Sequence, residues 1–257
     1  MQKKSSKIII IAVAFLLVVG FGILLINNYQ TKTSFKYNDA KTETLKPEKN
    51  KQDAVSEAVI KNAKKPRKIA GKKYKSSGVL QVEKSDHTLG NKNAPIVMIE
   101  YASLSCPHCA AFNRESFGRI KEKYIDSGEM LFVFRNFPLN QPALVASMFA
   151  SCIAKDDNDK YFKTIKNLFK TQDAWAFDAS FEKRLEALSK LEGMSGEDFQ
   201  KCINDDKLKQ EILTDRIAAA KSLNMKSVPS FFINGELASG YVDYVTLEKA
   251  IEKKLSK

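Results

Sequence analysis

Cysteine is scarce in this sequence, which has four in 257 residues. Only Cys106 and Cys109 have the close spacing of a metal-binding knuckle, because Cys152 and Cys202 are single and far apart along the chain. Structural zinc sites usually combine two short knuckles. The cysteine pattern therefore argues against a zinc centre, and we expect no metal ion.

Most of the chain also lacks a net charge. Residues 76–257 carry 25 basic and 25 acidic side chains, so the formal net charge of +12 lies before them. Residues 1–30 contribute +3, and residues 31–75, with 14 Lys or Arg and 5 Asp or Glu, contribute +9. A nucleic-acid-binding domain usually gathers basic side chains on its folded surface. We therefore expect no nucleic-acid partner.

Long apolar runs are absent except for one, from Ile8 to Ile26, which three lysines precede. As a helix it would span about 28 Å, close to the hydrocarbon thickness of a bilayer. A cleaved signal peptide has a shorter apolar core, although Gly20 and Gly22 offer small residues for cleavage. We expect residues 1–30 to be either a membrane anchor or a signal peptide, and both deliver the chain to a membrane.

Residues 31–75 are polar, rich in Lys and almost free of aromatic side chains. Such a segment buries too little apolar surface to fold alone, so we interpret it as a stalk. No internal repeat is found in the rest of the chain. Residues 76–257 are long enough for one domain with a well-formed core.

The hydrophobic pattern of residues 76–257 predicts an α/β fold. Two nearly continuous apolar runs, at 94–104 and 129–137, read as buried strands, and a helix beginning at Pro107 joins them. A helical block is expected at about 139–224, with helices around 141–155, 159–170, 179–191, 195–204 and 206–223. A strand at 228–235 ends in Asn234-Gly235, a hairpin-turn dipeptide, and a partner strand and a C-terminal helix follow. Trp175, Phe177 and Phe181 are expected in the core of the helical block, and His87 in an exposed polar loop.

The sequence "ASLSCPHCAAF", residues 102–112, places a cysteine pair where a buried strand gives way to a helix. The helix dipole and free N–H groups favour a negative sulfur at this point. We expect Cys106 to be exposed at the helix tip and Cys109, three residues on, to be tucked beneath it. His108 can donate a hydrogen bond to the Cys106 thiolate and add a positive charge, or be a surface residue only. A purely structural disulfide is disfavoured because so short a ring constrains little of the unfolded chain.

The sequence "SVPSFF" contains Val228-Pro229, a candidate cis peptide bond opening a strand. This run and "LGNKNAPIVMIEYASLSCPHC" resemble the DsbA family of thioredoxin-fold thiol oxidases, over roughly residues 85–257. The resemblance implies a thioredoxin fold with an inserted helical domain. It also implies that the loop of Val228 and Pro229 packs beside the cysteine pair and docks the substrate chain.

Glu100 stands inside the first apolar run, where an acid is costly without a partner or a task. The resemblance implies a buried carboxylate that handles the proton of Cys109, and the alternative is a side chain on a solvated side of the strand. Cys152 and Cys202 form either a second, structural disulfide, as an oxidising compartment favours, or two buried free thiols.

We therefore expect a thiol–disulfide oxidoreductase that donates a disulfide to reduced exported proteins. An oxidising dithiol indicates the periplasm, as either a released or an anchored protein. The resemblance implies reoxidation by a DsbB-type, quinone-linked membrane partner, and no dissolved cofactor is needed because the cysteines carry the electrons. The alternatives are a disulfide isomerase or reductase of the same fold, and a membrane-tethered peptide-binding or chaperone module.

Overall fold

The computed structural model describes residues 78–238 and 243–256. The expected anchor at 1–30 and the stalk at 31–75 lie outside these residues. Within the described part, no helix has both the length and the apolar character needed to cross a bilayer.

The strands are β1 (His87–Gly90), β2 (Ile96–Ala102), β3 (Met130–Asn136), β4 (Ser230–Ile233) and β5 (Glu236–Leu237). The helical elements are η1 (Gly78–Leu80), α3 (Pro107–Phe112), η2 (Asn113–Phe117), α4 (Gly118–Ile120), η3 (Lys121–Ile125), α5 (Gln141–Ala154), α6 (Asn158–Lys170), η4 (Gln172–Ala174), α7 (Phe181–Leu191), α8 (Gly196–Ile203), α9 (Asp206–Ser222) and α10 (Tyr244–Leu255).

The strands form one mixed sheet in the order β1-β3-β2-β4-β5. The central strands β2 and β3 are parallel, with Met98 opposite Phe132, and the other neighbours are antiparallel. All residues of β2, and the first five of β3, are buried. Strands covered on both faces need apolar side chains at successive positions, which explains the two continuous apolar runs.

The crossover from β2 to β3 is a helical stretch from α3 to η3 that contains two π-helical segments. It covers the face of the sheet that carries Glu100, and its Phe112 ring lies 4.5 Å from Phe231 of β4. Helix α6 packs on the same face, where Phe162 lies 5.8 Å from Phe132. The start of α3 is thereby fixed between the sheet and the helical block.

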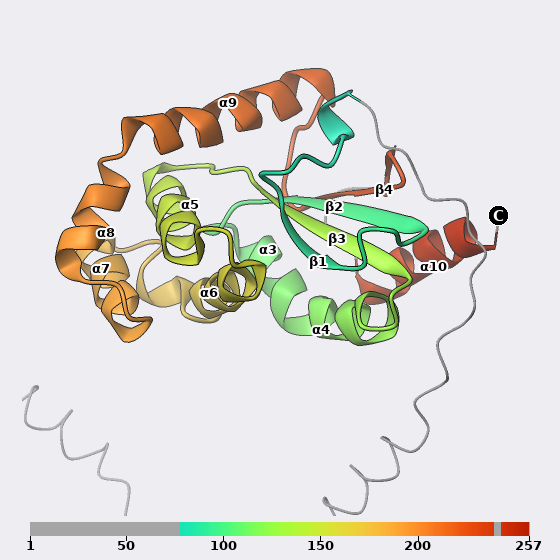
Figure 1. Ribbon diagram of the computed structural model, residues 1–257, viewed down its shortest axis with the longest axis horizontal. Helices are drawn as coiled ribbons and strands as arrows, with labels where there is room; N and C mark the ends of the chain where they lie inside the picture. The colour runs from blue at the N-terminus through green and yellow to red at the C-terminus, as the bar shows by residue number, and fades with distance from the viewer. Residues whose placement is uncertain (1–77, 239–242, 257) are drawn as a thin grey trace, which may run out of the picture. The chain divides into compact units, whose positions relative to one another are not determined.

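The helical block comprises α5 to α9, inserted between β3 and β4, and Figure 1 shows α5, α7 and α8 gathered beyond one end of the sheet. Its helices lie within two residues of the predicted bounds. A disulfide between Cys152 and Cys202, with an S–S distance of 2.11 Å, joins α5 to α8. Trp175 is fully buried as predicted, but Phe177 is 64% exposed, so its placement in the core was wrong.

The opposite face of the sheet is crossed by the segment through which the chain enters the domain. Arg135 of β3 donates to the backbone carbonyls of Val79 and Gln81 and forms an ion pair with Asp86 at 2.7 Å. The Tyr101 hydroxyl also donates to the Val79 carbonyl, at 3.2 Å. These contacts fasten η1 to the two central strands.

The predicted hairpin after β4 is present. Asn234 and Gly235 both have positive φ, 47° and 79°, as the tight turn requires. The Asn234 side chain accepts a hydrogen bond from the backbone N–H of Val97 at 2.8 Å, which ties the turn to β2. The partner strand β5 is only two residues long and exposed.

Strand β1 was not predicted, and the exposed loop assigned to His87 is wrong. His87 begins β1 and is half-buried, with its ring stacked on Tyr161 at 3.5 Å between centroids. Burial lowers the pKa of its imidazole. A polar edge strand of four residues carries neither an apolar run nor a clear alternation, so the sequence gives it no signal.

Candidate functional site

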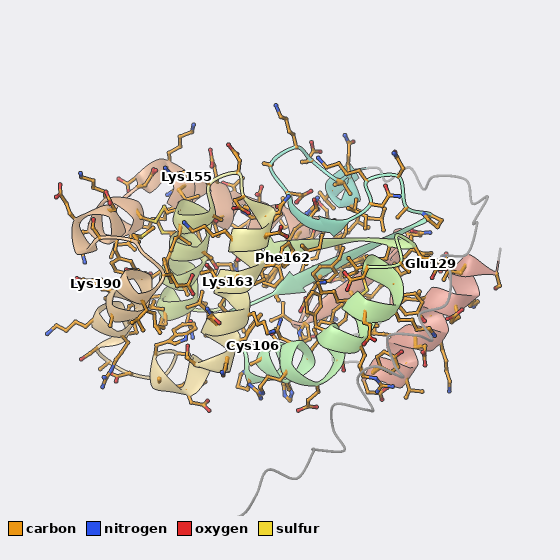
Figure 2. The ribbon with its side chains drawn as sticks, turned by 60° about the horizontal axis from the view of Figure 1, so that its bottom comes forward. Cys106, Glu129, Lys155, Phe162, Lys163 and Lys190 are labelled. Atoms are coloured by element: carbon orange, nitrogen blue, oxygen red, sulfur yellow. A yellow bond between two sulfur atoms is a disulfide. The ribbon has the colours of Figure 1, made fainter. Side chains whose placement is uncertain are left out.

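The cysteine pair lies where β2 gives way to α3. Cys106 has an extended backbone, with φ −84° and ψ 120°, and is the N-cap of a helix whose first residue is Pro107. Proline suits this position because its missing N–H has no partner in a first helical turn. Figure 2 shows Cys106 at the end of the helical stretch from α3 to η3 that faces the helical block, with Glu129 beyond the other end of this stretch.

The two sulfurs are unequally accessible, but both lie deeper than predicted. Cys106 is 7% exposed and Cys109 is fully buried, and both are free thiols. The expectation of an exposed Cys106 was therefore wrong, and Pro107 and His108 face the solvent instead. Cys106 thus keeps a small exposed area that a reaction partner can reach, whereas Cys109 keeps none.

Hydrogen-bond donors around Cys106 stabilise its thiolate. The pKa of Cys106 is lowered from 9.0 to about 6, chiefly by the Cys109 thiol, which donates a hydrogen bond to it. The backbone N–H groups of Cys109 and His108 add to the lowering, and the charge of His108 makes a smaller contribution. These N–H groups belong to the free first turn of α3, so the Cys109 thiol and the helix start both contribute more than the charge of His108.

The surroundings of Cys109 and Glu100 raise their pKa values, whereas those of Cys106 lower its pKa. Burial raises the pKa of the Cys109 thiol, and the nearby charges of Cys106 and Glu100 raise it further. Glu100 is 2% exposed, so the solvated alternative for its side chain is wrong. Burial raises the pKa of its carboxyl well above the usual range, and Oε1 has no hydrogen-bond partner among the described residues. In both groups, burial therefore favours the protonated form.

The loop before β4 lies beside the reactive sulfur. The Val228–Pro229 peptide bond is cis, as the sequence predicts. The Cys106 thiol donates to the backbone carbonyl of Val228 at 3.6 Å, and Val228 is 8% exposed. Residues 122 positions apart are thus brought into contact.

Gln172 in η4 is a site residue that the sequence did not reveal. It is 3% exposed, and its Nε2 donates to the carbonyls of Leu104 and Cys106 at 2.7 and 3.1 Å. A lone glutamine in a helical region carries no motif, so one sequence offers no signal for it. Among the described residues, no cluster of three or more His, Cys, Asp or Glu is arranged to hold a metal ion.

Comparisons with known proteins agree with this geometry. A family model described as thioredoxin matches residues 82–253. A curated relative from Rickettsia conorii, named as a protein-disulfide oxidoreductase, is 31% identical over 221 residues, which cover 84% of this chain and 77% of the relative.

Solved structures show the same likeness. The crystal structure of alpha-DsbA1 from Wolbachia pipientis is 36% identical, covers 66% of this chain and 91% of that chain, and has a TM-score of 0.59. The oxidised BdbD from Bacillus subtilis is 23% identical, covers 68% of this chain and 95% of that chain, and has a TM-score of 0.61, which supports the fold. The mixed sheet with a helical insertion is therefore a thioredoxin fold, and the chain belongs to the family of DsbA-like protein-disulfide oxidoreductases.

Proposed function

We propose that this oxidoreductase works as a dithiol oxidase, which donates the Cys106–Cys109 disulfide to reduced exported proteins. The observation that carries the proposal is the unequal acidity of the two cysteines. Donors that stabilise the Cys106 thiolate favour the reduced pair, and a pair that favours reduction is an oxidant. Each unit by which the Cys106 pKa falls stabilises its thiolate by about 1.4 kcal/mol relative to its thiol.

The reaction consists of two thiol–disulfide exchanges. A substrate thiolate attacks Cys106 Sγ, so a substrate–Cys106 disulfide forms and the Cys106–Cys109 bond breaks. Cys109 leaves as a thiolate and takes the proton of Glu100, which later regains one from water. A second substrate thiolate then attacks the substrate sulfur of the mixed disulfide and releases Cys106 as a thiolate. Two electrons pass to the protein, and the substrate leaves with one disulfide.

The surrounding residues have supporting roles in this proposal. The cis loop of Val228 and Pro229 docks the substrate chain, since the Val228 carbonyl already contacts the attacked sulfur. His108 adds a positive charge at the solvent side of Cys106. Glu100 assists Cys109, since its carboxyl is buried, has a raised pKa and is electrostatically coupled to that thiol.

The proposed location is the periplasm, with residues 1–26 either retained as an anchor or cleaved. The Cys152–Cys202 disulfide supports an oxidising compartment, where such bonds persist. Reoxidation of Cys106 and Cys109 then falls to a DsbB-type, quinone-linked membrane partner. N-terminal sequencing of the mature protein distinguishes the anchored form from the released one.

The deciding experiment is the equilibrium of the Cys106–Cys109 pair with glutathione. We expect a potential well above that of thioredoxin, which is about −270 mV. A reduction potential as low as that of thioredoxin would contradict the oxidase proposal and indicate a reductase. Cys106→Ser should abolish oxidation of a reduced peptide. A peptide-binding module would instead show no oxidation even in the unmodified protein, and its affinity for the peptide would be the same with and without Cys106→Ser.

A further inference from the structure

The loop between β2 and α3 contains the backbone carbonyls of two buried residues, Leu104 and Cys106. Leu104 is fully buried, and Cys106 is 7% exposed. The Leu104 carbonyl accepts a hydrogen bond from Gln172 at 2.7 Å. The Cys106 carbonyl accepts from Gln172 at 3.1 Å and from the backbone N–H of Ala110 at 3.1 Å. A buried carbonyl left unpaired costs about 1–3 kcal/mol, so these contacts help to determine the conformation of the loop.

Gln172 holds this loop from a rigid position. Its own carbonyl accepts hydrogen bonds from the backbone N–H groups of Trp175 at 3.2 Å and Ala176 at 2.8 Å. The Trp175 ring is fully buried, and its Nε1 donates to the Leu168 carbonyl of α6 at 3.1 Å. The Gln172 amide is therefore anchored to the helical block, while the carbonyls that it binds belong to the active-site loop.

The hydrogen bond from Gln172 to the Cys106 carbonyl links this restraint to the reactive sulfur of the same residue. This carbonyl accepts the first hydrogen bond of α3, so its orientation sets the direction in which the helix starts. The free N–H groups of that first turn, on His108 and Cys109, are the backbone donors to Cys106 Sγ. Tilting the helix start turns these donors away from the sulfur, because hydrogen bonds weaken steeply with angle.

We propose that Gln172 is a positioning residue for the reactive sulfur. By holding the carbonyls of Leu104 and Cys106, it fixes the start of α3 against the helical block and keeps the first-turn N–H groups directed at Cys106 Sγ. This inference rests on the proposed role of Cys106 as the attacked sulfur, and it assigns the helical block a part in the chemistry of the pair.

The test compares Gln172→Met, which keeps the length of the side chain and removes both donors, with Asn167→Ala as a matched control. Asn167 lies in the same block, and its Nδ2 donates to Glu192 at 2.9 Å, away from the cysteine loop. The readouts are the pH midpoint of Cys106 alkylation in the reduced protein and the equilibrium constant with glutathione. Urea unfolding of both variants reports their loss of stability.

For Gln172→Met we expect the alkylation midpoint to rise by about 0.5–1 unit and the equilibrium with glutathione to become about three- to tenfold less oxidising. For Asn167→Ala we expect a comparable loss of stability with neither readout changed. A Gln172→Met variant that loses stability but keeps both readouts would reduce Gln172 to a structural residue and overturn the proposal.

Two further measurements keep the test decisive if Gln172→Met fails to fold. Gln172→Asn retains the amide but is too short to reach both carbonyls, and we expect a smaller shift of the alkylation midpoint in the same direction. In the unmodified protein, the side-chain 15N–1H resonances of Gln172 should shift with pH at the Cys106 midpoint, and invariant resonances would contradict the proposal. Because alkylation does not depend on whether the pair oxidises or reduces proteins, failure of the oxidase proposal leaves this test intact.

Discussion

The stability of the reduced domain should depend on pH in a way that the oxidised domain does not share. Folding lowers the pKa of Cys106 from 9.0 to about 6. A depressed pKa contributes stability that is complete above the unfolded value, near pH 9, and is lost as the pH falls through the folded value, near pH 6. In the oxidised form Cys106 has no ionisable thiol, so this contribution is absent.

The expected size follows from the two pKa values. At about 1.4 kcal/mol per pKa unit, the Cys106 thiolate contributes almost nothing at pH 5, about 1 kcal/mol at pH 7 and about 2–3 kcal/mol at pH 8. The free energy of unfolding of the reduced form should therefore rise by about 2–3 kcal/mol, relative to that of the oxidised form, between pH 5 and pH 8. The ring constraint of the disulfide adds an offset that does not vary with pH.

Urea unfolding of both redox forms from pH 5 to pH 8 measures this difference. Trp175 is the only tryptophan and is fully buried, so its fluorescence reports the transition. Taking the difference between the two forms at each pH cancels the contribution of groups that titrate alike in both. Both forms carry Cys152→Ala and Cys202→Ala, so that the second disulfide does not affect the difference. Free energies that run parallel across this pH range would show that Cys106 is not acidic and would remove the basis for the oxidase proposal.

Three variants test His108, Glu100 and the Cys152–Cys202 disulfide. His108→Ala should raise the alkylation midpoint of Cys106 by about one unit or less, because an exposed charge is worth about 0.2–1 kcal/mol, and by less than Cys109→Ala does. Glu100→Gln should slow oxidation of a reduced peptide at least about tenfold in stopped-flow assays, and an unchanged rate would exclude proton transfer from Glu100. Cys152→Ala with Cys202→Ala should cost about 2–4 kcal/mol in urea unfolding, and a shifted Cys106 midpoint would show that this disulfide is more than structural.

Much of this fold could be predicted because its central elements are defined by local patterns. The strands β2 and β3 are buried on both faces and so appear as apolar runs, and the helices of the block end near the expected residues. Strand β1 could not be predicted because it is short, polar and paired only to β3. Residues 87–90 form a strand because they pair with β3, which lies more than 40 residues further along the chain.

The parts of the site that could be predicted are those whose residue types, cysteine and proline, occur in few structural settings. A cysteine pair at a helix start and a proline opening a strand each indicate their roles from local sequence. The depth of Cys106 and the contacts of Gln172 are set by the packing of the helical block on the cysteine loop, across 66 or more residues. No local pattern reports such a contact.

The attachment of η1 to Arg135 has a mechanical consequence. A pull on the chain before Gly78 reaches the folded domain at the Val79 and Gln81 carbonyls, and Arg135 passes the load into the centre of the sheet. The Cys106 loop is restrained from the other side, by Gln172 of the helical block. The entry segment and the Cys106 loop are therefore held by different hydrogen bonds, the first by those of Arg135 and Tyr101 and the second by those of Gln172.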